Sequence, residues 1–212
     1  MIDQIGQRLD IALCDDRRDV LRALLSVFTT SRGFCIVGEG HSAEDALALA
    51  ERHMPHVLVL DLQMAGGGLQ AANTVYVGLP FVRSVILTST DDEDVIASCL
   101  IAGAYDVLSK GLPAEEIRSR VRAVAAGEAV ITPALAARLI SVGRYAQPWY
   151  QQESSGNELD LITREQQVLS RLAQSLSPHE IGMDLSISAR LVRTYCFNIL
   201  TKVHSAELVG QL

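Results

Sequence analysis

Short apolar runs alternate with stretches of helical periodicity through the first two-thirds of the chain. Five of these runs have the length and the branched or aromatic content of buried strands. They cover residues 9–14, 34–40, 56–61, 82–89 and 104–109. Helical patterns follow the first, second, fourth and fifth runs. This alternation predicts an α/β domain with a parallel sheet that helices cover on both faces.

Capping residues mark where several of these helices begin. Ser42 precedes one helix, with Asp45 at the capping-box position that Glu or Gln usually fills. Pro113 suits the first turn of another, and Glu115 and Glu116 complement its dipole. A further helix, "TPALAARLISVG", closes this part of the chain.

The remaining third has a different pattern. Residues 145–160 show neither helical nor strand periodicity and are rich in Gln, Ser, Gly and acidic residues, which is typical of a linker. Beyond them, "TREQ" (163–166) and "SPHE" (177–180) are capping boxes, and Ser188 can cap a third helix that reaches about residue 202. Two short helices joined by the turn "SIS" form a helix-turn-helix pattern.

Composition excludes several classes of protein. The net charge of -7 argues against a broad, nonspecific nucleic-acid binder but leaves room for a small DNA-reading face. Four scattered cysteines indicate reduced thiols in a cytoplasmic protein, since no CxxC pair suggests a zinc site or a disulfide frame. No apolar run approaches the roughly 20 residues of a membrane helix. The first residues also lack the order of a signal peptide, so we expect no membrane association.

Polar side chains follow most of the predicted strands. The first strand leads into Asp15 and Asp16, the third ends on Asp61, the fourth ends at Thr88, and the fifth precedes Lys110. If the first and third strands are neighbours, three carboxylates converge at one sheet edge and need a cation. Mg²⁺ suits such oxygen ligands. Singly, each residue is an ordinary cap or surface charge, but together they indicate phosphoryl transfer to Asp61.

These motifs resemble a known family. "IALCDD", "VLVLDLQM", "VILTS" and "AGAYDVLSK" resemble, in order, the receiver domains of response regulators, which implies a flavodoxin-like sheet of order 2-1-3-4-5. The segment from "LITREQQVL" to "NILTKV" resembles a LuxR-type output domain, and the two together resemble the NarL/FixJ class. The implied domains are a receiver (1–131), an interdomain helix and linker (132–160) and a DNA-binding domain (161–212).

The resemblance implies a role for each residue of the acidic edge. Asp61 would be the phosphoacceptor, Asp15, Asp16, Asp61 and the Gln63 backbone carbonyl would hold Mg²⁺, and Thr88 and Lys110 would contact the phosphoryl oxygens. The implied partners are a sensor histidine kinase, operator DNA and a second copy of the chain. No enzymatic activity is expected beyond phosphoryl uptake and slow self-hydrolysis.

Two regions depart from the family pattern. Ala65 stands where the family usually has Pro, in a glycine-rich loop that is about one residue short, so we expect the loop to hold a phosphorylated state less firmly. Val107 stands where the family usually has the Tyr or Phe of the switch. Tyr105 shares its strand face and is a possible substitute.

The third helix of the output domain has two faces. Val192, Cys196, Ile199, Leu200 and Val203 recur at helical spacing and are expected in the core. The opposite face, which would enter the major groove, carries Arg190, Arg193, Thr194, Phe197 and Thr201. From Glu153 onward seven acidic residues outnumber five basic ones, which is unusual for a DNA binder.

Two hypotheses about function therefore stay open. The first is a DNA-binding transcriptional regulator of a two-component system, gated by phosphorylation of Asp61. The second is an atypical regulator controlled by a partner, a ligand or oligomerisation, with weak DNA binding. A hydrolase of the haloacid-dehalogenase kind also uses a strand-end Asp, but it needs a second Asp at position 63, which here is Gln.

Overall fold

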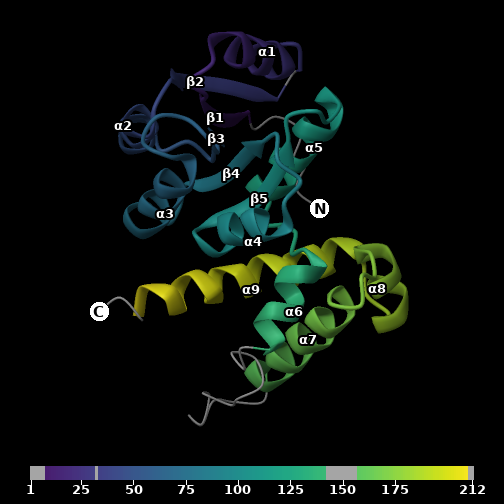
Figure 1. The fold of residues 1–212 in the computed structure, drawn as a ribbon. Coiled ribbons are helices and arrows are strands. Elements are labelled where there is room, and N and C mark those ends of the chain that lie inside the picture. The colour runs from purple at the N-terminus through teal and green to yellow at the C-terminus, as the bar shows by residue number, and fades with distance from the viewer. Residues whose placement is uncertain (1–7, 32, 142–156, 210–212) are drawn as a thin grey trace.

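A computed structural model describes residues 8–31, 33–141 and 157–209 of the chain. Five parallel strands form one sheet of order β2-β1-β3-β4-β5, as predicted (Figure 1). The strands are β1 (Leu9–Cys14), β2 (Phe34–Gly40), β3 (Val57–Asp61), β4 (Arg83–Thr88) and β5 (Ala104–Ser109).

Helices cover both faces of this sheet. They are α1 (Arg18–Thr29), α2 (Ala43–His53), α3 (Gly68–Gly78), α4 (Glu93–Ile101) and α5 (Ala114–Ala125). Successive residues of β3 point to opposite faces, so that Val57 and Val59 belong to the core under α1 and α5, while Leu58 and Leu60 belong to the core under α2 and α3. Burial on both faces explains why the strands are nearly continuous apolar runs.

Helix α3 is the element of the sheet domain that the hydrophobic pattern did not locate. Its buried face consists mainly of small residues, Gly68, Ala71 and Ala72, with Val75 as the one larger side chain. The hydrophobic pattern of such a helix differs little from that of a loop. The alternation of strands and helices still required a crossover connection between β3 and β4.

The C-terminal part is helical. It contains α6 (Pro133–Ser141), α7 (Asn157–Leu172), α8 (Pro178–Leu185) and α9 (Ala189–Val209). The capping box at Ser177 and Glu180 is present, and the Ser188 hydroxyl accepts a hydrogen bond from the Leu191 amide at 3.1 Å. These two helix starts were therefore predicted correctly from the sequence.

Two helix boundaries differ from the prediction. Helix α7 begins at Asn157, so Thr163 lies inside the helix and "TREQ" is not its N-cap. The start of α7 falls within the predicted linker, whose residues 145–156 lie outside the described part of the chain. Helix α9 continues beyond residue 202 to Val209, and His204, just past the predicted end, contacts the sheet domain.

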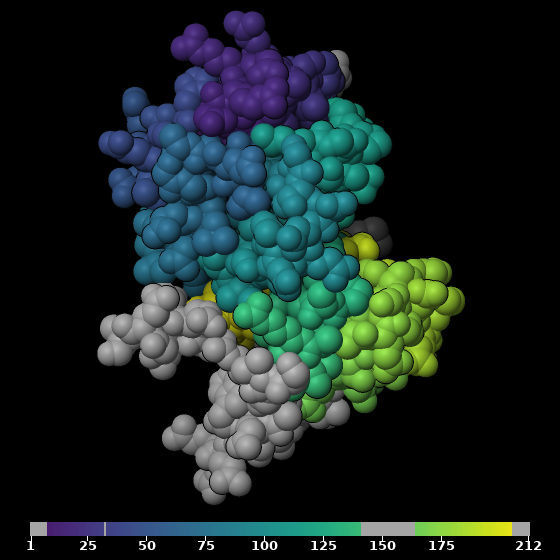
Figure 2. All heavy atoms as spheres, in the orientation of Figure 1, coloured from purple at the N-terminus to yellow at the C-terminus, as the bar shows by residue number. Residues whose placement is uncertain are grey.

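Helix α9 lies across the sheet domain, below α3 and α4 in Figure 1, with α6 and α7 on its other side. In the space-filling view, small yellow parts of α9 are visible between the sheet domain and the helices below it (Figure 2). Among the described residues, no helix has the length and apolarity required to span a bilayer.

Candidate functional site

The carboxyl ends of β1 and β3 bring three carboxylates together. These strands are hydrogen-bonded neighbours, with Cys14 opposite Leu60, so Asp15 and Asp61 follow them at the same edge. Asp15 is 0% exposed and Asp61 is 4% exposed, whereas Asp16 faces solvent. One carboxylate oxygen from each of the three lies within 4.8 Å of the others. Buried carboxylates at this spacing need a neutralising cation.

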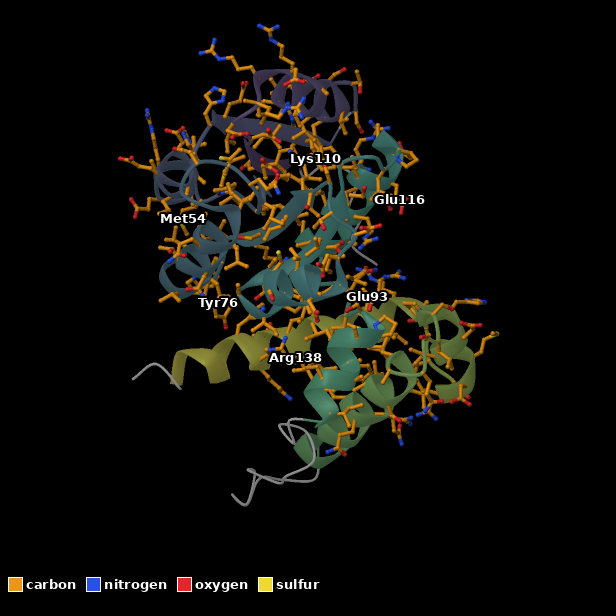
Figure 3. All side chains as sticks on the ribbon, viewed as in Figure 1. Met54, Tyr76, Glu93, Lys110, Glu116 and Arg138 are labelled. Atoms are coloured by element: carbon orange, nitrogen blue, oxygen red, sulfur yellow. The ribbon has the colours of Figure 1, made fainter. Side chains whose placement is uncertain are left out.

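Lys110 supplies one such cation. Its Nζ lies 2.7 Å from Asp15 Oδ2 and 2.8 Å from Asp61 Oδ1, and its side chain is 18% exposed. Burial alone would lower the pKa of Lys110, but the hydrogen bonds to Asp15 and Asp61, together with their charges, outweigh burial and raise it. Lys110 therefore stays protonated and connects the end of β5 to the carboxylates (Figure 3).

Thr88 completes the polar edge. Its side chain is buried at the end of β4, next to β3, where Asp61 pairs with Leu87. The Thr88 hydroxyl accepts a hydrogen bond from the Thr90 amide at 3.1 Å, and its carbonyl accepts one from the Lys110 amide at 2.8 Å. Thr88 and Lys110 are thus fixed to each other through the backbone.

The loop after β3 needs its glycines for geometric reasons. Gly66 and Gly67 have φ values of 82° and 80°, in the left-handed region that favours glycine. A Cβ on Gly68 would lie 2.0 Å from the Asp61 carbonyl oxygen, a distance that no side chain can occupy. The Ala65 carbonyl accepts a hydrogen bond from the Ala43 amide at 2.8 Å, so the loop is tied to the start of α2.

The donor set fits a hard divalent cation. Carboxylate oxygens are the ligands that Mg²⁺ prefers, and the exposed Asp16 leaves the cluster open to water on one side. Gln63 lies two residues after Asp61 in the same loop, and its side chain is exposed. The structure brings Asp15, Asp16, Asp61 and Lys110 together, with Thr88 at the neighbouring strand end.

A second polar face lies on α9. The five residues predicted for the core of the output domain, Val192, Cys196, Ile199, Leu200 and Val203, are all buried. On the opposite face, Arg190 and Arg193 both pair with Glu128, which follows α5. Arg190 Nε lies 3.0 Å from one Glu128 oxygen, and Arg193 Nε lies 2.7 Å from the other. The Ala129 amide also donates a hydrogen bond to the Arg193 carbonyl at 3.1 Å.

Phe197 and Thr201 face the sheet domain in this arrangement. The Phe197 ring stacks on Tyr105 of β5 with centroids 4.5 Å apart, and the Arg83 guanidinium lies 5.0 Å from the Phe197 centroid. The Tyr105 hydroxyl is 3.5 Å from Thr201 Oγ1. The predicted DNA-reading face is therefore partly covered by the domain predicted to carry the phosphoryl group, and Tyr105 lies at the contact.

His204 is a contact that the sequence did not single out. Its ring lies between Tyr76 of α3 and Tyr105, and its Nε2 is 2.6 Å from the Leu100 carbonyl oxygen. Figure 3 shows Tyr76 on the side of α3 that faces α9. The residue lies just past the predicted end of its helix, and its partners are more than ninety residues away, so no local pattern could identify it.

Two family models match the chain. The model described as "Response regulator receiver domain" matches residues 11–122, and the model described as "Bacterial regulatory proteins, luxR family" matches residues 160–210. Together they cover both the acidic edge and the helix-turn-helix.

Similar proteins span almost the whole chain. The uncharacterized transcriptional regulatory protein YxjL of Bacillus subtilis is 31% identical over 94% of this chain and 91% of its own length. The transcriptional regulatory protein LiaR of the same organism is 28% identical over 93% of this chain and 92% of its own. The RcsB response regulator of Salmonella typhimurium, at 17% identity, matches over 93% of each chain with a TM-score of 0.55, which shows a shared fold.

Proposed function

The chain belongs to the response regulators of two-component systems that join a receiver domain to a LuxR-type DNA-binding domain, and we propose that phosphorylation of Asp61 controls its activity as a transcriptional regulator. The observation that carries this proposal is the convergence of Asp15, Asp16, Asp61 and Lys110 at one sheet edge. The domain limits proposed are 1–131 for the receiver, 132–160 for the interdomain helix and linker, and 161–212 for the output domain.

The proposed chemistry is transfer of a phosphoryl group to Asp61. A carboxylate oxygen of Asp61 attacks the phosphorus of the donor, the bond from phosphorus to the leaving group breaks, and an acyl phosphate remains on Asp61. Bound Mg²⁺ would neutralise charge on the transferring group. Asp15, Asp16, Asp61 and the Gln63 carbonyl would hold the metal.

Lys110 and Thr88 would act on the phosphoryl oxygens. The Lys110 ammonium, which neutralises Asp15 and Asp61 in the unmodified protein, would exchange one carboxylate contact for a phosphoryl oxygen. Thr88 could donate its hydroxyl proton to a second oxygen. This exchange would change the carboxyl end of β5, and Tyr105 lies near the start of the same strand. We propose that Tyr105 and Val107 transmit this structural change along β5 to α9.

The proposed target is operator DNA, bound through Arg190, Arg193, Thr194, Phe197 and Thr201. Arg193 can make a two-pronged contact to a guanine edge, and Phe197 can cover a thymine methyl group. In the structure α9 lies against the receiver, an arrangement that we call closed. In the closed arrangement Arg193 pairs with Glu128 and Phe197 stacks on Tyr105. DNA binding would therefore require α9 to leave the receiver. A homodimer would match the two-fold symmetry that such operators usually have.

A phosphodonor assay tests the proposal. Acetyl phosphate should add the mass of one phosphoryl group in the presence of Mg²⁺, and chelation of the metal should prevent the gain. Asp61→Asn should abolish it, whereas Asp16→Asn should raise the Mg²⁺ concentration that the gain requires. Absence of the mass gain at every Mg²⁺ concentration would favour the second candidate, a regulator controlled by a partner through the closed contact with α9.

A further inference from the structure

His204 lies inside the contact between α9 and the receiver. It is 2% exposed, and its Nε2 is 2.6 Å from the Leu100 carbonyl oxygen, which makes Nε2 the protonated nitrogen of a neutral ring. Tyr76 and Tyr105 meet the ring edge to face, with centroids at 4.6 Å and 5.4 Å. All three partners belong to the receiver, so His204 joins the two domains.

The second ring nitrogen has no partner. Nδ1 of His204 is buried without a hydrogen bond, which a neutral imidazole tolerates, since there Nδ1 is only an acceptor. Protonation would place a buried N–H and a positive charge at that position with no acceptor. Burial lowers the pKa of His204 to about 4, although the hydrogen bond to the Leu100 carbonyl opposes the change.

Among the side chains that the structure describes, those that contact His204 do not compensate for a charge. Tyr76 faces it from α3 and Tyr105 from β5, and burial raises the pKa of Tyr105, so the Tyr105 ring carries no charge near pH 7. Helix α4 presents the Leu100 carbonyl. On the receiver side of the contact, the cation Arg83 of β4 lies over the Phe197 ring and is itself positively charged, so it does not offset a charge on His204. Lys202, on the same helix as His204, is paired with Glu165 of α7.

We propose that His204 is a pH-sensitive latch, which holds α9 on the receiver while it is neutral and releases α9 when it is protonated. The proposal rests on the proposed function, because the released helix is the one proposed to bind DNA. It adds acidification as a second input, one that needs neither Asp61 nor a kinase.

The direction and size of the effect follow from linkage. The closed form binds the proton of His204 at a pKa of about 4, and the open form at the ordinary value of 6.5. The population of the closed form is therefore highest above pH 6.5 and decreases as pH falls from 6.5 toward 4. Between pH 7.5 and 5.5 the ratio of open to closed molecules should rise about tenfold. If only the open form binds DNA, the apparent affinity rises by the same factor.

Binding of a fluorescent mixed-sequence duplex to the full chain, at both pH values and constant salt, tests the latch. Wild type should bind about tenfold more tightly at the lower pH, and so should a His53→Gln control, which lacks an exposed imidazole of α2 but keeps His204. His204→Gln, neutral at both pH values and able to donate to the Leu100 carbonyl, should bind weakly at both. His204→Lys, charged at both, should bind tightly at both. An equal pH response in wild type and His204→Gln would overturn the proposal.

Imidazole NMR of the full chain provides a readout that is independent of DNA. His204 should titrate below its ordinary value of 6.5, and the Tyr76 and Tyr105 ring signals should shift with it. Titration of His204 at its ordinary value, or without any change in these rings, would overturn the latch. If no variant binds the duplex while the NMR coupling is present, the proposed DNA binding fails and the latch stands.

Discussion

Replacing Glu128 with glutamine should free α9, the helix proposed to bind DNA, without phosphorylation. In the closed arrangement, one buried carboxylate holds both Arg190 and Arg193. Glutamine keeps the size of the side chain but removes its charge and one acceptor oxygen. DNA would need the same two guanidinium groups, so Glu128 and a phosphate or guanine edge compete for them.

The free-energy change expected for Glu128→Gln follows from how exposed the Arg190 and Arg193 side chains are. The Arg190 side chain is 69% exposed, so solvent screens its pairing and its contribution is at most about 1 kcal/mol. The Arg193 side chain is 35% exposed, and we assign its charge-assisted bond to the buried carboxylate about 1–1.5 kcal/mol. A total near 1.5–2 kcal/mol corresponds to a shift of about 10- to 30-fold toward the open form.

The assay is a DNA-binding titration of the full, unphosphorylated chain. Glu128→Gln should raise affinity by about 10- to 30-fold over wild type at low salt, and by less at high salt, because screening already weakens the two ion pairs of the wild type. Glu116→Gln is the matched control, since it removes the same charge from an exposed position on α5 (Figure 3). Equal affinities for Glu128→Gln and Glu116→Gln would refute the reasoning that the receiver competes with DNA for these arginines.

Two further substitutions test other parts of the molecule. Gly68→Ala should lower the free energy of unfolding by about 2 kcal/mol or more and slow phosphorylation, because its Cβ would meet the Asp61 carbonyl oxygen at 2.0 Å. Gly78→Ala is the control, since its Cβ would meet nothing within 4 Å, and it should leave the temperature of thermal unfolding unchanged or slightly higher. Val107→Tyr should couple phosphorylation more strongly to dimerisation, as judged by sedimentation of the phosphorylated and unphosphorylated chains. If phosphorylation shifts the monomer–dimer equilibrium of the wild type equally, Val107 has no role in this coupling.

The sheet and its acidic edge could be predicted because their signals are local. Each strand is a continuous apolar run that ends in a polar residue, and parallel strands place their carboxyl ends at one edge, so Asp15 and Asp61 had to meet. The inner face of α9 could also be predicted, since helical spacing alone separates Val192, Cys196 and Ile199 from their neighbours.

The contact between the domains could not be predicted in this way. Phe197 stacks on Tyr105, and His204 bonds to the Leu100 carbonyl, across about ninety to a hundred residues of sequence. No periodicity relates such pairs, and Glu128 alone is indistinguishable from an ordinary solvated acid near a helix end. The assignment of Arg193 and Phe197 to DNA stays a prediction, because in the closed arrangement both contact the receiver side.

The central claim is that phosphorylation of Asp61 controls DNA binding, and its most direct test measures both in one experiment. DNA affinity should be measured for the full chain before and after phosphorylation with acetyl phosphate and Mg²⁺, alongside Asp61→Asn treated identically. Phosphorylation should raise the affinity of wild type and leave that of Asp61→Asn unchanged, because only modified Asp61 would shift Lys110 and weaken the hold on α9. A wild type that takes up the phosphoryl group with no change in DNA affinity, or an equal gain in Asp61→Asn, would contradict control through Asp61.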